Sequence, residues 1–263
     1  MIDLHCHILP GIDDGPATIE DSLALARAAA ACGTRTILAT SHVSWRYPND
    51  HQTLARLTAE LNARLRAEAI ELRVLTGAEI AMTYAMEAEP AELSRLGLGG
   101  GRWVLIEPPF TQVVGNLDLL LVNLQRAGLR VVLAHPERCP AFHRDPQMLR
   151  SLVDSGILTS ITAGSLVGRF GGEVRRFALE LMHEGTVHNV ASDAHDHLRR
   201  APGIAQELER SGFAPLTAWL TEEVPSAIIN DQEIPPRPAH ASSRESSSRW
   251  LPWLRRKRIR RVS

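Results

Sequence analysis

The feature that most constrains the fold of this chain is a regular alternation of short apolar runs with longer helical segments. The apolar runs, predicted as strands, span 1–5, 36–40, 73–77, 102–106, 130–134, 157–162 and 188–192. Helices are predicted between or after them at 18–31, 51–69, 117–127, 146–154, 173–184, 203–210 and 216–223, with a short helix or irregular link at 87–95. Continuously apolar strands that alternate with helices are typical of a parallel sheet covered on both faces.

Seven such units predict an α/β fold, either an open doubly wound sheet or a closed (β/α) barrel. The length of 263 residues suits one barrel domain. Pro-rich and Ser-rich segments between 234 and 248 place the end of this domain near residue 235. Residues 236–263 are predicted to form a disordered basic tail.

Ionisable side chains follow six of the seven predicted strands. They are His5, His7, Asp13 and Asp14 after the first strand, His42 after the second, Glu79 after the third, Glu107 after the fourth, His135 after the fifth, and Asp193 and His195 after the seventh. The carboxyl ends of parallel barrel strands open on one face, where active sites are built. Any one of these residues alone could be a turn cap or a satisfied core group. Their repetition at six strand ends favours a common site, and therefore the barrel.

The first strand ends in His5-Cys6-His7. In an extended backbone His5 and His7 point to one side and Cys6 to the other. Two imidazoles on one strand face can bind one metal ion, although packed or solvated histidines would leave the same pattern. The later strand ends favour the metal interpretation because they supply further ligands.

The candidate ligands are all imidazoles or carboxylates, which suit Zn, Mn, Fe or Mg. They exceed the needs of one ion, so we expect two or three ions that share a carboxylate. Such clusters convert a bound water to hydroxide at neutral pH and clamp the oxygens of a phosphoryl group. Arg138 and either Arg199 or Arg200 lie beside the ligands, and guanidinium groups bind phosphate. The pattern predicts a metal-dependent phosphoesterase.

These motifs resemble the polymerase-and-histidinol-phosphatase (PHP) superfamily of metal-dependent phosphoesterases. The resemblance rests on His5-Cys6-His7, Asp13-Asp14-Gly15 and the segments 39–42, 77–79, 105–107, 134–138 and 192–195. Within that superfamily, the opening segment 3–15 is similar to the bacterial manganese-dependent protein-tyrosine phosphatases of capsule and exopolysaccharide operons. The resemblance covers residues 1 to about 210, with the motifs in family order.

The resemblance implies a distorted, TIM-like, seven-stranded (β/α) barrel with three divalent ions, manganese before iron, zinc or magnesium. It assigns His5, His7, Glu79 and Asp193 to a first ion, Glu79, Glu107 and His135 to a second, and Asp14, His42 and His195 to a third. It also implies phosphate binding by Arg138 and, by position, by Arg200. The sequence leaves two choices between neighbours open, Asp13 or Asp14 and Arg199 or Arg200.

The implied activity is that of a cytoplasmic protein-tyrosine phosphatase in which metal-bound hydroxide attacks phosphorus without a covalent phosphoenzyme. The implied partner is a membrane-bound tyrosine kinase that controls capsule or exopolysaccharide biosynthesis. Two rivals stay open: another PHP phosphoesterase acting on histidinol phosphate or nucleotides, and a non-catalytic metal-bound scaffold that binds the kinase. Cysteine-based phosphatase chemistry is excluded, because it needs Arg at the sixth residue after Cys, and Cys6, Cys32 and Cys139 lack it. Three widely spaced cysteines favour a reducing cytosol.

One motif departs from the family pattern. The second strand usually ends in Thr-Pro-His-His, whereas this chain has Ser41-His42-Val43. The ligand histidine is present, but the adjoining loop 44–50 differs. In that loop, Trp45 and Tyr47 either stack on an aryl group or pack against the protein.

The net charge of -1 hides an asymmetry between body and tail. Residues 237–263 hold nine Lys or Arg and one Glu, so the tail carries +8 and the preceding body -9. Such a tail is either simply solvated or docks on an anionic membrane surface, where Trp250 and Trp253 would assist. A peripheral position at the inner face of the membrane is therefore an option. Nucleic acid is disfavoured as a partner, and oligomerisation is left open.

Overall fold

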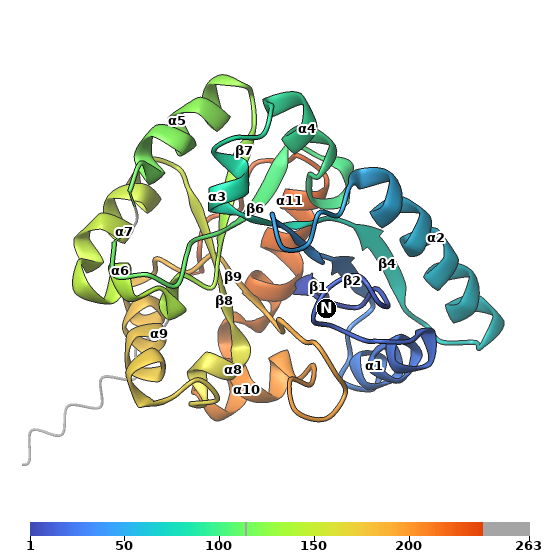
Figure 1. Ribbon diagram of the computed structural model, residues 1–263. Coiled ribbons are helices and arrows are strands. Elements are labelled where there is room, and N and C mark those ends of the chain that lie inside the picture. The colour runs from blue at the N-terminus through green and yellow to red at the C-terminus, as the bar shows by residue number, and fades with distance from the viewer. Residues whose placement is uncertain (114, 239–263) are drawn as a thin grey trace, which may run out of the picture.

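The computed structural model describes residues 1–113 and 115–238, and every strand pair in these ranges is parallel. A three-stranded sheet has the order β1 (Ile2–Cys6), β2 (Thr36–Ala39), β4 (Arg73–Thr76). A six-stranded sheet has the order β3 (His42–Val43), β5 (Glu79–Ala81), β6 (Trp103–Glu107), β7 (Arg130–Ala134), β8 (Leu158–Thr162), β9 (Asn189–Ala191). The predicted α/β class with parallel strands is confirmed (Figure 1).

The second and third predicted strands, 36–40 and 73–77, form as β2 and β4, but each is followed by a short further strand that was not predicted. The chain leaves β2 at Ala39 and pairs again only at His42, and it leaves β4 at Thr76 and pairs again at Glu79. Gly77 lies at the second break, where a Cβ would come within 3.1 Å of Leu98 Cδ2. The breaks let β2 and β4 pair with β1 while β3 and β5 join the other sheet. The described residues thus contain nine strands where seven were predicted.

The first and last strands meet and join the two sheets. Cys6 forms a parallel bridge with Ala194, and the Asp193 amide donates to the His5 carbonyl at 2.8 Å. Buried Asp3 strengthens this seam by accepting hydrogen bonds from the Ser192 amide at 3.0 Å and the Ser192 hydroxyl at 2.5 Å. The pairing of β1 with the end of β9 brings the predicted ligands His5 and His7 next to Asp193 and His195.

Helices lie around the outside of the strands (Figure 1). They are α1 (Ile19–Ala31), α2 (His51–Ala67), α3 (Met82–Ala85), α4 (Pro90–Arg95), α5 (Leu117–Arg126), α6 (Pro140–Arg144), α7 (Pro146–Asp154), α8 (Ala163–Leu166), α9 (Gly172–Glu184), α10 (Ile204–Arg210) and α11 (Val224–Ile229). The predicted helix 216–223 is instead a π-helical turn, Trp219–Glu223, that continues into α11. Short 3₁₀ turns occupy Leu98–Gly100, Pro136–Arg138 and Ala214–Leu216. The short helices α3, α6 and α8 were not predicted.

The core lies between the sheets and the helices and is built from the apolar runs that predicted the strands. Leu4, Ile37, Leu105 and Leu133, one from each of four strands, are fully buried. A polar side chain inside these covered strands needs a partner, as Asp3 has in Ser192, and the other ionisable side chains lie toward the carboxyl edge.

The body continues slightly past its predicted end. The Trp219 indole N–H donates to the Pro235 carbonyl at 3.0 Å, and the Arg237 guanidinium donates to the Met182 carbonyl at 2.7 Å. Contacts with the body therefore reach two residues beyond the predicted boundary at 235. The rest of the predicted basic tail, 239–263, lies outside the described residues.

Candidate metal centre

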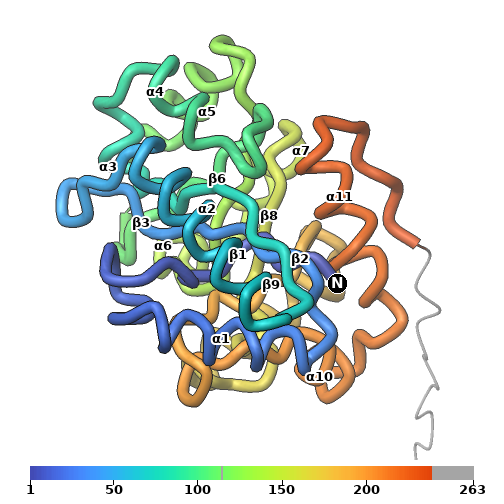
Figure 2. Tube along the Cα trace, turned by 90° about the vertical axis from the view of Figure 1, so that its right-hand side faces the viewer, coloured from blue at the N-terminus to red at the C-terminus, as the bar shows by residue number. Residues whose placement is uncertain are grey.

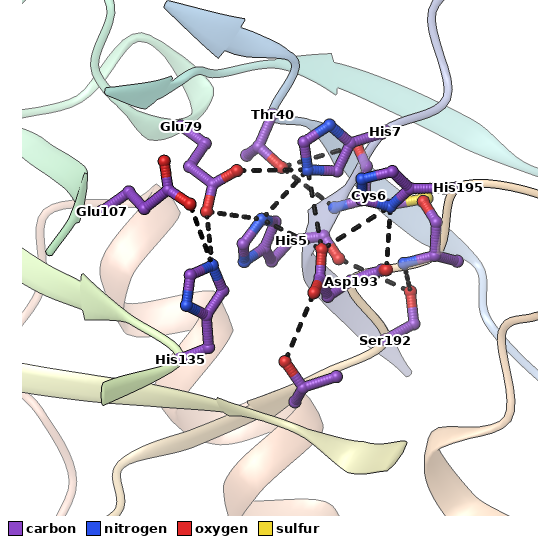
Figure 3. Close-up of polar contacts among 12 residues, drawn as sticks. His5, Cys6, His7, Thr40, Glu79, Glu107, His135, Ser192, Asp193 and His195 are labelled. Atoms are coloured by element: carbon purple, nitrogen blue, oxygen red, sulfur yellow. Dashed lines mark hydrogen bonds and ion pairs between the residues drawn. The ribbon is translucent and has the colours of Figure 1, made fainter. Parts of the chain in front are cut away.

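All nine side chains predicted as metal ligands converge at the carboxyl ends of the strands. Figure 3 labels His5, His7, Glu79, Glu107, His135, Asp193 and His195 among them. The nine fall into four overlapping groups of donor atoms lying within 4.8 Å of one another: His5, His7 and Asp193; His5, Glu79 and His135; His42, Glu79 and Glu107; and His7, Asp14, His42 and His195. Register explains part of this convergence, since His42 and Glu79 are paired neighbours on β3 and β5. The shared members, His5, His7, His42 and Glu79, tie the groups into one continuous cluster.

The group at the centre is formed by His5, His7 and Asp193, all buried. The two imidazole Nε2 atoms are 3.3 Å apart, and each lies 3.6 Å from Asp193 Oδ1. Glu79 adds an oxygen 3.3 Å from His5 Nε2 and another 3.2 Å from His7 Nε2. As the strand pattern predicted, His5 and His7 face the same side, while Cys6 points into the protein.

Glu79 links this group to Glu107 and His135. His135 Nε2 lies 2.8 Å from Glu79 Oε1 and 3.7 Å from Glu107 Oε1. Burial and the neighbouring charge of Glu79 raise the pKa of Glu107 to about 8. Burial opposes ionisation of Glu79 as well, but the charges of His5 and the hydrogen bond from His135 hold its pKa well below the usual range. Glu79 is thus the carboxylate that two of these donor groups share.

The third predicted group contains Asp14, with Asp13 in a different role. Asp14 Oδ1 lies 3.2 Å from His195 Nε2 and 3.4 Å from His42 Nε2. The Asp13 carboxylate instead sits 2.9 Å from His7 Nδ1 and accepts from the Gly15 and His42 amides at 2.9 and 3.1 Å. Asp13 therefore orients His7 from behind, an arrangement common for metal-ligating histidines. The structure places Asp14, not Asp13, in the donor cluster.

The backbone is unusual at two of these residues. His135 has φ of 30° and Asp193 has φ of 49°, in the left-handed region that non-glycine residues rarely adopt. Each such conformation costs about 1–3 kcal/mol and persists where the surroundings over-determine it, often at functional sites. Both residues project donors into the cluster, so the strained turns serve to aim those side chains.

The donor set fits divalent cations. Glu79 and Asp193 are buried carboxylates, at 1% and 2% exposure, and each has an oxygen within 3.6 Å of the His5 and His7 imidazole nitrogens. Buried anions are costly unless they are paired or coordinate a metal. An oxygen and nitrogen set without thiolate suits Mn, Fe, Zn or Mg.

The two predicted phosphate-binding arginines reach the cluster through Asp193. Arg138 Nη1 and Arg200 Nη2 donate to Asp193 Oδ2 at 2.7 and 2.6 Å. Since His5 and His7 face Oδ1, one oxygen of the Asp193 carboxylate faces imidazoles and the other faces arginines. Arg199 is exposed, and its backbone amide bonds Asp196 in the turn that positions Arg200. The geometry thus favours Arg200, the residue preferred by position in the sequence.

Some residues that shape the site gave no sequence signal. Buried Glu137 accepts from the Thr162 amide at 2.9 Å and the Ser165 hydroxyl at 2.6 Å, which fixes the turn carrying Arg138. The Arg138 guanidinium also lies 5.0 Å from the ring centre of Phe110 and 4.4 Å from that of Phe170. Contacts of this kind depend on loops far apart in sequence, so only the structure reveals them.

The buried cysteines are not nucleophiles. Cys6 Sγ donates to the Ala194 carbonyl at 3.6 Å and Cys139 Sγ to the Pro109 carbonyl at 3.4 Å. Burial raises the pKa of both thiols, so neither is a thiolate at neutral pH. The exclusion of thiol chemistry, made from the sequence, holds for both.

Comparison with known proteins places this architecture in a family. The profile described as "Capsular polysaccharide synthesis, CpsB/CapC" matches residues 1–211. The chain is 38% identical to the tyrosine-protein phosphatase YwqE of Bacillus subtilis, over 90% of this chain and 96% of that protein. It is 31% identical to the tyrosine-protein phosphatase CpsB of Streptococcus pneumoniae, over 89% of this chain and all of that protein.

Solved structures agree with this placement. A crystal structure from a study of YwqE and CpsB, described as unique metal-dependent tyrosine phosphatases, superposes with a TM-score of 0.80 at 37% identity. That match covers 91% of this chain and 100% of the solved one. An organophosphorus hydrolase variant from Deinococcus radiodurans shares the fold, with a TM-score of 0.53 at 16% identity over 87% of this chain and 92% of that one.

Proposed function

We infer that this chain, which belongs to the CpsB/CapC family of capsular polysaccharide synthesis proteins, is a metal-dependent protein-tyrosine phosphatase. One observation carries this proposal: nine imidazole and carboxylate side chains converge beside two arginines. The cluster suits divalent ions and the arginines suit a phosphate, so a phosphoric monoester is the substrate class that uses both.

We propose that the cluster binds three ions. His5, His7, Glu79 and Asp193 would hold the first, with Glu79 bridging to a second on Glu107 and His135. Asp14, His42 and His195 would hold the third, and manganese is the ion we expect first. Bound divalent ions supply an activated water and offset charge on the phosphoryl oxygens.

The protein's own groups then bind and orient the phosphate. Arg138 and Arg200 converge on Asp193 Oδ2, so a phosphate seated beside the cluster would meet two guanidinium groups at once. Glu137, through its bonds to Thr162 and Ser165, keeps the turn bearing Arg138 in place. The tyrosine oxygen leaves readily, because a phenol with a pKa near 10 carries negative charge well. No side chain is needed as a covalent nucleophile.

The strand arrangement supports a distorted barrel as the finer description of the fold. A stave is here one strand position in the barrel wall. If β2 and β3 count as one interrupted stave, and β4 and β5 as another, the strands from β1 to β9 form seven staves. The bridge between Cys6 and Ala194 joins the first stave to the last. This proposal explains why the cluster gathers ligands from nearly every stave.

The proposed substrate is a phosphotyrosine protein, with a membrane-bound kinase of capsule or exopolysaccharide synthesis as the natural partner. Family membership in capsular polysaccharide synthesis supports this choice. Within the described residues, no helix is both long and apolar enough to cross a bilayer. We propose a cytoplasmic enzyme that meets its kinase at the inner face of the membrane.

A substrate panel tests the proposed function. Protein loaded with Mn is offered a phosphotyrosine peptide, histidinol phosphate, other small alcohol phosphates and phosphorylated DNA ends. We expect kcat/KM to be highest for the phosphotyrosine peptide. Preference for histidinol phosphate or DNA ends would favour another PHP phosphoesterase, and inertness toward every ester would favour the scaffold. A phosphoenzyme trapped in a single turnover would contradict direct hydrolysis.

A further inference from the structure

Exposed apolar side chains gather on the face of the molecule that holds the metal centre. Seven large apolar residues in the described ranges are exposed, and five of them lie on loops that follow the carboxyl ends of strands: Trp45, Met86, Phe110, Val113 and Leu198. The other two, Leu119 and Val122, lie on α5. Apolar side chains beside a polar cluster suit a ligand that carries an anion at one end and an apolar group at the other.

Trp45 is the most prominent aromatic member of this rim. It lies on the loop between β3 and α2, which extends from the side of the body (Figure 2), and 63% of it is exposed. The loop is held in place because Tyr47 stacks on His42 with ring centres 5.5 Å apart, and the Ser44 amide donates to the Tyr47 carbonyl at 2.9 Å. Of the two loop aromatics, Tyr47 therefore packs on the cluster, while Trp45 touches Tyr84, at 5.0 Å between ring centres, and otherwise faces solvent.

Phe110 is the aromatic member closest to the ligands. It follows Glu107 on the loop after β6, and its ring stacks on His135 at 5.5 Å with only 15° between the planes. Half of the residue is exposed despite this contact and that with Arg138. β3, β5 and β6 are neighbours in the sheet, so Trp45, Tyr84 and Phe110 lie on three consecutive loops of one side of the mouth. Arg138 follows β7, the neighbour of β6, and its guanidinium lies 5.0 Å from the Phe110 ring centre, while Arg200 follows β9.

We propose that Trp45 and Phe110 form an aryl-binding rim that recognises the phenyl ring of phosphotyrosine and makes the site selective against alkyl phosphates. This inference rests on the proposed function, because the phosphate must occupy the metal centre for the ring to reach the rim. Phe110 adjoins both Arg138 and His135, so the ring of an aryl phosphate held at Arg138 would lie beside an aromatic side chain. An aromatic contact contributes beyond simple burial, enough for about a 3- to 10-fold preference per ring.

Phosphonate inhibitors isolate this rim from the chemistry of the leaving group. Phenylphosphonate and methylphosphonate bring similar anions to the centre, and only the first carries a ring. Binding of each to the Mn-loaded full chain is measured by calorimetry for wild type, Trp45→Ala, Phe110→Ala and Phe110→Leu. Leu119→Ala, an exposed apolar residue on α5, is the matched control. Metal content of every variant is measured alongside, because Phe110 touches His135.

Wild type should bind phenylphosphonate more tightly than methylphosphonate. Trp45→Ala and Phe110→Ala should each weaken phenylphosphonate about 3- to 10-fold and change methylphosphonate by less than about twofold. Phe110→Leu should show the same selective loss with full metal content, and Leu119→Ala should match wild type. The proposal is overturned if wild type shows no preference for phenylphosphonate. It is also overturned if the Trp45 and Phe110 variants keep that preference, or if they bind both phosphonates more weakly by the same factor. Failure to hydrolyse phosphotyrosine peptides would count against the proposed function alone, since binding is measured without turnover.

Discussion

At the scale of single residues, Asp193 organises the site. One of its carboxylate oxygens faces His5 and His7 and the other receives Arg138 and Arg200. The sequence predicted these residues because parallel strands must end at one edge. It could not choose between Asp13 and Asp14, or between Arg199 and Arg200, because neighbours in a loop share the same sequence context. The turn around Asp196 favours Arg200, and the hydrogen bond that Asp13 accepts from His7 leaves Asp14 as the donor in the cluster.

The two neighbouring arginines give a direct test at this scale. Arg200→Lys should lower kcat/KM for a phosphotyrosine peptide about 10- to 100-fold, because a charge-assisted, bidentate contact to phosphate is lost. Arg199→Lys, which alters an exposed side chain, should change kcat/KM less than about twofold. Steady-state kinetics on both variants measures these changes. Equal losses of kcat/KM would show that phosphate binding is wrongly assigned to Arg200.

At the scale of elements, helix positions were predictable from local signals. Thr18 caps α1, and its hydroxyl accepts from the Asp21 amide while the Asp21 carboxylate accepts from the Thr18 amide. The renewed strand pairing at His42 and Glu79 was not predictable, because β3 and β5 are only two and three residues long and leave no periodic pattern. Pairing with a second sheet, a contact between distant segments, determines where each strand stops.

The cap of α1 supports a stability prediction. Thr18→Ala removes one half of the reciprocal cap and should lower the free energy of unfolding by about 1 kcal/mol. Urea denaturation measures this value, and kcat/KM should stay at the wild-type level because α1 contributes no donor to the cluster. A stability loss near zero would show that the cap is dispensable.

A second element-scale prediction concerns His188, which comes directly before β9. Burial and the charge of Arg237 lower its pKa to about 4, and its Nδ1 faces the Thr159 amide at 3.3 Å. The unfolded chain, with a histidine pKa near 6.5, binds more protons between pH 4 and 6.5. The contribution of neutral His188 to the free energy of unfolding is therefore fully present above pH 6.5 and is lost as the pH falls toward 4.

Urea denaturation at pH 7 and pH 5 measures that effect. Between pH 7 and pH 5, the free energy of unfolding of wild type should fall by up to about 2 kcal/mol more than that of His188→Gln, because the variant has no imidazole to protonate. Other titratable groups are the same in both proteins, so their effects cancel when the two pH-dependent changes in unfolding free energy are subtracted. Identical pH dependence in the two proteins would contradict the burial argument.

At the scale of the whole molecule, the cluster joins segments from residue 5 to residue 195. Ions that bind donors from almost every strand should stabilise the folded chain as a unit. The α/β class and the common site could be predicted because alternation and strand ends are local patterns. The division into two sheets and the seam at Asp3 and Ser192 could not, because they depend on contacts between the two ends of the body.

Chelation therefore has a predicted global effect. Removing metal with excess EDTA should lower Tm and abolish turnover, and returning Mn at about 100 times its Kd should restore roughly 2.7 kcal/mol of stability. Differential scanning calorimetry at fixed protein concentration measures the shift. A Tm that does not respond to EDTA or Mn would show that the ions do not bridge the strands.

The central claim is that His5 belongs to a multinuclear catalytic centre, and metal content measured together with phosphotyrosine turnover tests it most directly. Wild type should hold three ions per chain, while His5→Ala should hold fewer and lose roughly 10²-fold or more in kcat. Cys6→Ala, the neighbour that faces away from the cluster, should keep both. Unchanged turnover and metal content in His5→Ala would contradict the account.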